Sequence, residues 1–120
     1  MGNVLNIVGK ISGKISKTLN LQAGANIVQS SGLIVHIQKR HPSCVKYIKD
    51  IPSIISSPDY IGINPNEVGT SFELVKIYAD NVQIGIKLDS KNNYFYVATL
   101  YTITNGKLQK KISSGRLTKI

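Results

Sequence analysis

Both histidines of the chain, His36 and His41, lie in one short basic stretch that also contains Lys39 and Arg40. An unperturbed imidazole has a pKa of about 6.5, so its protonated and neutral forms are both populated near neutral pH and it can act as an acid or as a base. The two cations between the histidines favour a negatively charged ligand. This stretch therefore predicts acid–base chemistry on an anionic substrate.

Pro42 places His41 at the start of a predicted helix. Proline cannot donate a backbone hydrogen bond, and it suits the first turn of a helix. The free amide groups of such a turn favour an anion beside the imidazole. We therefore favour His41 as the catalytic histidine, whereas His36 is either a second catalytic group or a structural histidine on an extended segment.

A second candidate for anion binding is the motif Ser-Ser-Gly-Arg-Leu at residues 113–117. The hydroxyl of Ser114, the backbone amides around Gly115 and the guanidinium of Arg116 could contact one phosphate. The alternative is a polar chain end with a flexible turn. The sequence leaves both interpretations open.

Length and charge limit the class of protein. A chain of 120 residues with 42% hydrophobic residues is expected to fold as a single domain with one core. It has 15 Lys and Arg against 6 Asp and Glu, a net charge of +9 and a pI near 9.8. The first partner to consider is a polyanion such as nucleic acid, with a solvated basic surface or a membrane-facing patch as alternatives.

Cys44 is the only cysteine, which excludes an internal disulfide and a zinc site built from several cysteines. We expect it to be a small core residue rather than a nucleophile. The chain has no apolar run of about 18 residues, and its first 31 residues do not resemble a signal peptide. These features favour a protein that acts in the cytoplasm and has no membrane span.

The elements that must position the histidines begin with residues 1–31, where apolar residues recur at helical spacing between lysines: Val4, Val8, Ile11, Ile15 and Leu19. Because Gly9 and Gly13 weaken this pattern, we expect a basic arm or a marginal helix. A membrane-surface helix is the minority interpretation. The remaining residues, 32–120, are expected to form the domain.

Residues 32–58 are expected to carry the histidines on an extended segment followed by helices. The β-branched run Gly-Leu-Ile-Val-His-Ile at 32–37 favours a short strand. After Pro42, the apolar residues Cys44, Tyr47, Ile48 and Ile51 recur on one helical face. Pro52 opens a second short turn, which Pro58 ends.

From residue 71 onward the pattern changes to strands. The runs at 71–79, 82–88, 93–103 and 107–112 are separated by Asp80-Asn81, by residues 89–92 and by Asn105-Gly106. Asn-Gly between two such runs is a strong hairpin signal. The sequence therefore predicts an α+β fold, with N-terminal helices packed on a roughly four-stranded antiparallel sheet. Residues 94–103 are bulky on both faces and form its central strand, so Thr99 and Tyr101 either face a cleft or serve packing.

Several motifs together resemble the phage-associated nuclease domains grouped with barnase, EndoU, colicin-type tRNases and RelE. These motifs are KRHP before a helix, PDYIGINP, ELVK, VATLYTI and a terminal SGRL. The resemblance runs from about residue 34 to residue 117 and leaves residues 1–31 outside. It implies helices packed on a four-stranded antiparallel sheet, and metal-independent RNA cleavage by a toxin used between bacteria or carried by phage. Its motif positions are occupied here by His36, Lys39, Arg40, His41, Thr99, Tyr101, Ser114 and Arg116.

Metal-free RNA cleavage needs a base for the ribose 2′-hydroxyl, a positive charge for the phosphorane and an acid for the departing 5′-oxygen. We expect the histidines to be the base and the acid, and we do not assign Glu73 the base role. The expected catalytic residues are His41, His36, Arg116, Thr99, Tyr101 and Ser114. The expected substrate-binding residues are Lys39, Arg40, Lys87 and Lys110.

The sequence therefore favours a monomeric endoribonuclease without cofactor or metal that acts on tRNA or mRNA in the cytoplasm. An acidic immunity protein is its candidate partner, because it would complement the positive charge. One alternative is a non-catalytic nucleic-acid-binding or phage structural protein that uses the same basic face. Another is an enzyme that acts on a small anionic ligand in a closed pocket.

Overall fold

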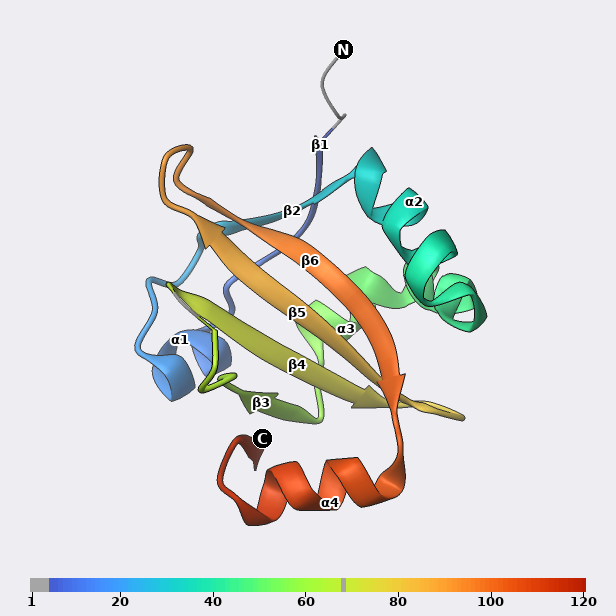
Figure 1. Ribbon diagram of the computed structural model, residues 1–120. Helices are drawn as coiled ribbons and strands as arrows, with labels where there is room; N and C mark the ends of the chain where they lie inside the picture. The colour runs from blue at the N-terminus through green and yellow to red at the C-terminus, as the bar shows by residue number, and fades with distance from the viewer. Residues whose placement is uncertain (1–4, 68) are drawn as a thin grey trace.

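The computed structural model describes residues 5–67 and 69–120, which form one mixed sheet with helices packed against it (Figure 1). The described strands number seven, in the order β1-β2-β6-β5-β4-β3-β7. Neighbouring strands are antiparallel except β2 and β6, which are parallel. The strands are β1 (Leu5–Lys10), β2 (Asn26–Ser30), β3 (Tyr60–Gly62), β4 (Ser71–Ile77), β5 (Asn81–Asp89), β6 (Tyr94–Ile103) and β7 (Leu117–Lys119). The helices are α1 (Gly13–Leu19), α2 (Ser31–Arg40), the 3₁₀ helix η1 (Pro42–Asp50), α3 (Ile51–Ser56) and α4 (Asn105–Ser113).

The main core lies on one face of the sheet. Val82, Ile84 and Ile86 of β5 are fully buried there, in one cluster with buried side chains from α1, α2, η1 and α3. Burying one such aliphatic side chain stabilises the fold by about 1.5–3 kcal/mol. Helix α4 contributes to a second, smaller cluster around Val75 and Leu108. The main cluster fixes the sheet against α2 and η1, which carry the histidines.

Three groups of predictions are confirmed. The helical face after Pro42 is η1, in which Cys44 and Tyr47 are buried, and the short turn after it is α3. The strands expected over 71–79, 82–88 and 93–103 are β4, β5 and β6, and they form an antiparallel meander. Strand β6 is central, because it lies between β5 and β2.

The α+β class is confirmed, but the four-stranded sheet with helices only at the N-terminal end is wrong. The first difference lies in residues 5–30, which supply β1, α1 and β2 in place of a marginal helix or arm. Strand β1 pairs with β2 and packs closely on α3 at Gly9, where a Cβ atom would lie 2.6 Å from Cγ2 of Ile55. The Ser12 hydroxyl then accepts a hydrogen bond from the Ile15 amide (3.2 Å) and caps α1. Val4 lies outside the described residues.

The second difference is that residues 32–37 are part of helix α2 and not of a strand. Leu33 and Ile37 are four positions apart and are both buried, which is helical spacing. Their burial in the main core outweighs the strand preference of the β-branched residues between them. As a result His36 lies inside a helix, and His41 lies at the junction of α2 and η1.

The third difference is that residues 107–112 form helix α4 and not the last strand of a meander. The Thr104 hydroxyl accepts a hydrogen bond from the Lys107 amide (3.2 Å), so Asn105-Gly106 begins a helix instead of turning a hairpin. Leu108 and Ile112 then lie on one helical face and pack in the second cluster. The neighbour that completes β6 is β2, from the N-terminal segment.

A β-bulge in β6 decides which side chains reach the site. Gly85 pairs with Thr99 and Ile86 pairs with Val97, so Ala98 is an extra residue on this strand. Strict alternation would place Thr99 on the core face with Val97. The bulge reverses the facing of the strand, because an extra residue shifts the alternation by one. Thr99 therefore faces away from the main core.

No helix within residues 5–67 and 69–120 combines the length and the apolar character needed to cross a membrane.

Candidate active site

The two predicted histidines lie side by side at the end of α2. Their ring centroids are 5.9 Å apart, and the ring planes are inclined by 73°. The backbone of His41 is held on both sides, since its amide donates to the carbonyl of Ile37 (2.8 Å) and its carbonyl accepts from the amide of Cys44 (2.8 Å). The imidazole of His41 is thus positioned by two consecutive helices.

Both imidazoles also reach β6. The Nε2 atom of His36 is 3.3 Å from the Thr99 hydroxyl, which is hydrogen-bonding distance. The ring centroid of His41 lies 5.5 Å from that of Tyr101. In the described part of the chain β2 pairs with β6 only at Phe95 and Tyr96, and α2 lies beside the rest of the strand (Figure 1). The structure therefore brings both histidines together with the two predicted strand residues.

A shallow groove opens over these residues. It has a volume of about 610 Å³. We call it the histidine groove, and it is lined by His36, Arg40, His41, Glu67, Lys87, Ala98 and Thr99. Among the lining residues, Lys87 forms an ion pair with Glu67 (3.3 Å), and Arg40 is exposed. Imidazoles and cations around an open groove suit a phosphate group of an extended substrate.

A second set of polar residues lies on the same sheet face, beneath α4. We call it the Glu73 cluster; its members are Glu73, Gln83, Tyr101, Lys111 and Arg116. The Glu73 carboxylate is almost fully buried and forms ion pairs with Arg116 and with Lys111 (3.5 Å). Gln83 is also buried and accepts a hydrogen bond from Lys111 (2.7 Å).

Tyr101 connects the two sets. Its hydroxyl accepts a hydrogen bond from Nε2 of Gln83 (2.7 Å), and its ring lies against His41. A continuous series of contacts therefore runs from His41 through Tyr101 and Gln83 to Lys111, and from Lys111 through Glu73 to Arg116. The imidazoles and the C-terminal guanidinium thus lie over the same sheet face.

Burial shifts two pKa values in the Glu73 cluster. Burial lowers the pKa of Lys111, the nearby Arg116 charge lowers it further, and the Glu73 carboxylate partly opposes the change. Burial also raises the pKa of Tyr101, and the Glu73 charge adds to this increase. The cause of both shifts is the shielding of these groups from water, since the Lys111 side chain is only 14% exposed and Tyr101 is half-buried.

Arg116 is fixed by a close approach of two strands. The positive φ of Gly115 (82°) reverses the chain after α4. A Cβ atom at Gly62 would lie 1.8 Å from the Arg116 carbonyl oxygen, so only glycine fits beside it. The Nε atom of Arg116 is buried and has no hydrogen-bond partner among the described residues. The C-terminal motif therefore places this guanidinium on Glu73.

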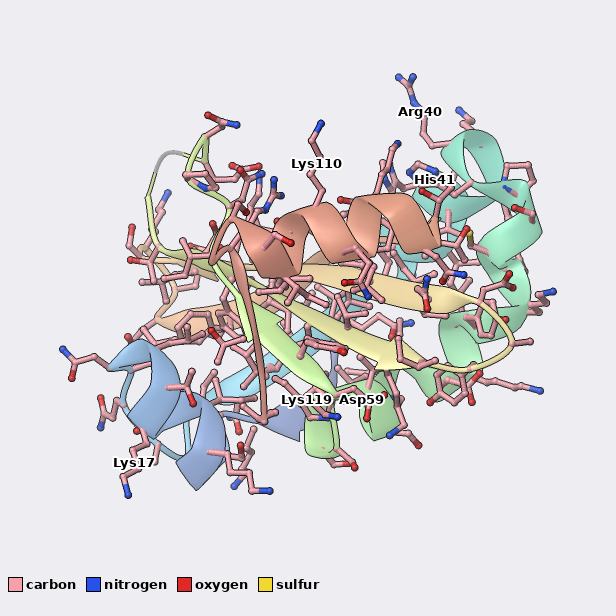
Figure 2. The ribbon with its side chains drawn as sticks, turned by 90° about the horizontal axis from the view of Figure 1, so that it is seen from below. Lys17, Arg40, His41, Asp59, Lys110 and Lys119 are labelled. Carbon is pink, nitrogen blue, oxygen red and sulfur yellow. The ribbon has the colours of Figure 1, made fainter. Side chains whose placement is uncertain are left out.

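The remaining predicted residues lie at the periphery. The Ser114 hydroxyl donates to the Lys111 carbonyl (3.1 Å) at the end of α4, and it is exposed. Lys39 is exposed at the end of α2. Figure 2 shows Lys110 projecting from α4 toward the side of the molecule on which Arg40 and His41 lie. Ser114 thus completes a helix end, and neither of the two lysines is among the residues that line the groove.

Sequence reasoning missed Gln83 and Lys111, and it set Glu73 aside. The sequence contained a signal for Gln83, because the alternation along β5 points this side chain away from the apolar face of the strand. No comparable signal existed for Lys111, whose segment was expected to be a strand. Within the described residues, no three or more His, Cys, Asp or Glu side chains are grouped so as to hold a metal ion.

The comparison with protein families gives one match. A family model described as phage-Barnase-EndoU-ColicinE5/D-RelE like nuclease3 matches residues 6–110. The chain belongs to this nuclease family. The match confirms the family drawn from the motifs. It includes residues 6–31, which were expected to lie outside, and it ends at residue 110, so the terminal SGRL motif is not part of it. Neither the curated proteins nor the solved structures contain a significant match to the nuclease.

Proposed function

We propose that this nuclease is an endoribonuclease that cleaves RNA without a metal ion, using His36 and His41 as base and acid. The observation that supports this most directly is the meeting of the two imidazoles with Thr99 over an open cationic groove. Family membership supports a nucleic-acid substrate. The net charge of +9 suits the phosphate backbone.

The proposed reaction is a transesterification. One imidazole removes the proton of the ribose 2′-hydroxyl, and the oxygen attacks the adjacent phosphorus to form a new P–O2′ bond. The other imidazole gives its proton to the 5′-oxygen as the P–O5′ bond breaks. The products are a 2′,3′-cyclic phosphate and a free 5′-hydroxyl.

The side chains around the imidazoles have supporting roles in this proposal. Arg40 and Lys87 stabilise the added negative charge of the phosphorane, a contribution of about 3 kcal/mol for a well-placed donor. Thr99 holds the orientation of His36 by its hydrogen bond, and Tyr101 packs against His41. Within the Glu73 cluster, Gln83 holds the Tyr101 hydroxyl by a hydrogen bond.

The proposal is tested by incubating the purified nuclease with total RNA and with tRNA in EDTA. We expect cleavage by the wild type, loss of cleavage in the variant that combines His36→Ala and His41→Ala, and no loss in Lys17→Ala. Lys17 is a suitable control because it projects from α1, far from Arg40 and His41 (Figure 2). An absence of cleavage, or cleavage that survives both histidine substitutions, contradicts the proposal.

A second candidate is a nucleic-acid-binding or phage structural protein without catalysis. The observation that favours it is that Arg116 and Lys111 are already paired with Glu73, which leaves the exposed cations of α2 to contact phosphate. Under this alternative Lys39→Ala and Arg40→Ala weaken RNA binding, whereas His41→Ala has no effect on any RNA-dependent measurement.

The biological role proposed here is that of a toxin acting on cytoplasmic RNA, with an acidic immunity protein as partner. The positive charge supports such a partner by electrostatic complementarity. Expression tests it: the wild type should arrest bacterial growth, and the double histidine variant should not. Equal growth with both proteins contradicts the toxin role and leaves the in vitro cleavage test unaffected.

A further inference from the structure

Beside the histidine groove lies a second hollow that the proposed chemistry does not use. Its volume is about 350 Å³. We call it the tyrosine pocket, and it is lined by Leu5, Ser30, Asp89, Tyr94, Tyr96 and Val97. Tyr94 and Tyr96 are half-buried, and Leu5 is 46% exposed. The pocket thus exposes two aromatic rings and one aliphatic side chain on a strongly basic protein.

The tyrosine pocket continues the histidine groove along the same strands. Tyr96 pairs directly with Lys87 across β5 and β6, and Lys87 lines the histidine groove. Directly paired residues point to the same side of a sheet, with Cβ atoms about 4.5–5.5 Å apart. Tyr94 follows two residues earlier on β6 and therefore faces the same side. An aromatic ring and a groove cation are consequently neighbours on this face.

Distances along β6 suit an extended nucleic-acid strand. Because Ala98 is an extra residue in the bulge, Thr99 and Tyr96 lie opposite Gly85 and Lys87, which are two residues apart on β5, and Tyr94 lies opposite Asp89, two residues further. At the usual rise of a strand the two tyrosines are therefore about 7 Å and about 14 Å along the sheet from Thr99. A single strand with one phosphate at the histidines can span this length with an adjoining nucleotide. Lys87 is then placed to contact the phosphate, and the tyrosine rings beside it are placed to stack on the base that follows.

Asp89 contributes to the pocket as a support and not as a reader of bases. Its carboxylate accepts hydrogen bonds from the amides of Lys91 and Asn92 (both 3.1 Å) and from the Asn92 side chain (3.0 Å). These bonds close the turn before β6, so the carboxylate is already occupied. The surfaces that remain for a ligand are ring faces and aliphatic carbon, which bind bases with little sequence preference.

We infer that Tyr94 and Tyr96 form a stacking subsite for a base one nucleotide beyond the two that flank the cleaved phosphodiester in single-stranded RNA. This inference rests on the proposed ribonuclease function and adds to it the substrate class, an unpaired strand longer than a dinucleotide. A base inside a duplex is already stacked on both sides, so the subsite disfavours double-stranded RNA.

The test compares a cleavable dinucleotide with oligoribonucleotides of the same central sequence extended by one or two nucleotides on either side. In the wild type, extension on one side raises kcat/KM. Tyr96→Ala removes that gain, a loss of about 5- to 150-fold on the extended substrate given the usual strength of base stacking. Tyr96→Ala leaves kcat/KM for the dinucleotide unchanged. Tyr96→Phe keeps the gain because the aromatic ring is kept, whereas Tyr96→Leu loses it. Tyr94→Ala should also reduce the gain in kcat/KM on the extended substrate.

A binding measurement separates the subsite from the chemistry. An extended oligonucleotide with a 2′-deoxyribose at the scissile position cannot be cleaved, and its Kd should rise in Tyr96→Ala by a similar factor. If the Kd changes while no RNA is cleaved, the catalytic proposal fails and the subsite stands. If Tyr96→Ala leaves both kcat/KM and Kd unchanged, or lowers the dinucleotide rate as much as the extended one, the subsite is excluded.

Discussion

The histidine groove and the Glu73 cluster share one sheet face but differ in how their charges are satisfied. In the groove, His36 and Arg40 are exposed, and the hydrogen bond between the His36 imidazole and Thr99 is long (3.3 Å). In the cluster, the Glu73 side chain is 6% exposed and is paired with Arg116 and Lys111, whose side chains are 22% and 14% exposed. The difference indicates that groups free to meet a substrate lie in the groove, whereas the charges of the cluster hold one another in place.

The largest effect expected from this comparison is on cleavage by the groove variants. His36→Ala and His41→Ala should each lower kcat by about 100- to 10,000-fold, as is usual for loss of a general acid or base. Their free energies of unfolding should change by less than about 1 kcal/mol, because His36 is exposed and His41 is only half-buried. Oligoribonucleotide cleavage and urea denaturation measure the two effects. A histidine variant with normal kcat removes that residue from the mechanism.

The opposite pattern is expected for the Glu73 cluster. Glu73→Gln should lower the free energy of unfolding by about 3 kcal/mol, because it leaves Arg116 and Lys111 without their counter-charge in a largely buried place. At a temperature at which the variant is folded, kcat should stay within about tenfold of the wild type, since Glu73 is not assigned proton transfer. Loss of kcat as large as in His41→Ala contradicts the division between the two regions, because it gives Glu73 a chemical role.

A smaller effect is expected on the salt dependence of RNA binding. The wild type should bind more weakly as salt rises, because its cations displace counterions from phosphates. Lys39→Ala and Arg40→Ala should each reduce the slope of log K against log salt by about one. Lys17→Ala on α1 serves as the control and should leave the slope unchanged. Equal slopes in all four proteins argue against phosphate contacts at the groove.

The smallest effects concern stability at alkaline pH. Because the pKa of Tyr101 is raised in the folded protein, the hydroxyl loses its proton at a lower pH in the unfolded chain than in the folded one. The stability of the wild type relative to Tyr101→Phe is therefore greatest below about pH 10 and declines as pH rises further. The lowered pKa of Lys111 has the opposite consequence: stability relative to Lys111→Met rises with pH toward the unfolded value of about 10.4. Urea denaturation of Tyr101→Phe and Lys111→Met between pH 8 and 11 measures both slopes. If the stability of the wild type relative to each variant changes with pH in the same direction, the result contradicts the burial of Tyr101 and Lys111 in the Glu73 cluster.

Local patterns predicted the meander and η1, because alternation on β5 and helical spacing after Pro42 are properties of short segments. They failed at α2 and α4. At α2, burial of Leu33 and Ile37 outweighed the strand preference of their β-branched neighbours. At α4, the Thr104 cap competed with the hairpin signal of Asn105-Gly106 and prevailed. In both places a tertiary contact or a cap decided between two local choices.

The site was predictable to the extent that its chemistry lies in one stretch. His36, Lys39, Arg40 and His41 stand together in the sequence, so their types and spacing indicated acid–base chemistry. The Glu73 cluster joins β4, β5, β6, α4 and the residue directly before β7, and its members become neighbours only in the folded sheet. The bulge at Ala98 turns Thr99 toward the groove. The alternation of residue types along β6 does not reveal this bulge.

The most direct test of the central claim, that His36 and His41 act as opposite partners on one phosphodiester, uses a substrate with sulfur in place of the bridging 5′-oxygen. A thiolate leaves without a proton, so this substrate bypasses the general acid. The account predicts that kcat of one histidine variant is restored to within about tenfold of the wild type on this substrate, while the other variant stays inactive. Rescue of both variants, or of neither, contradicts an acid and base pair.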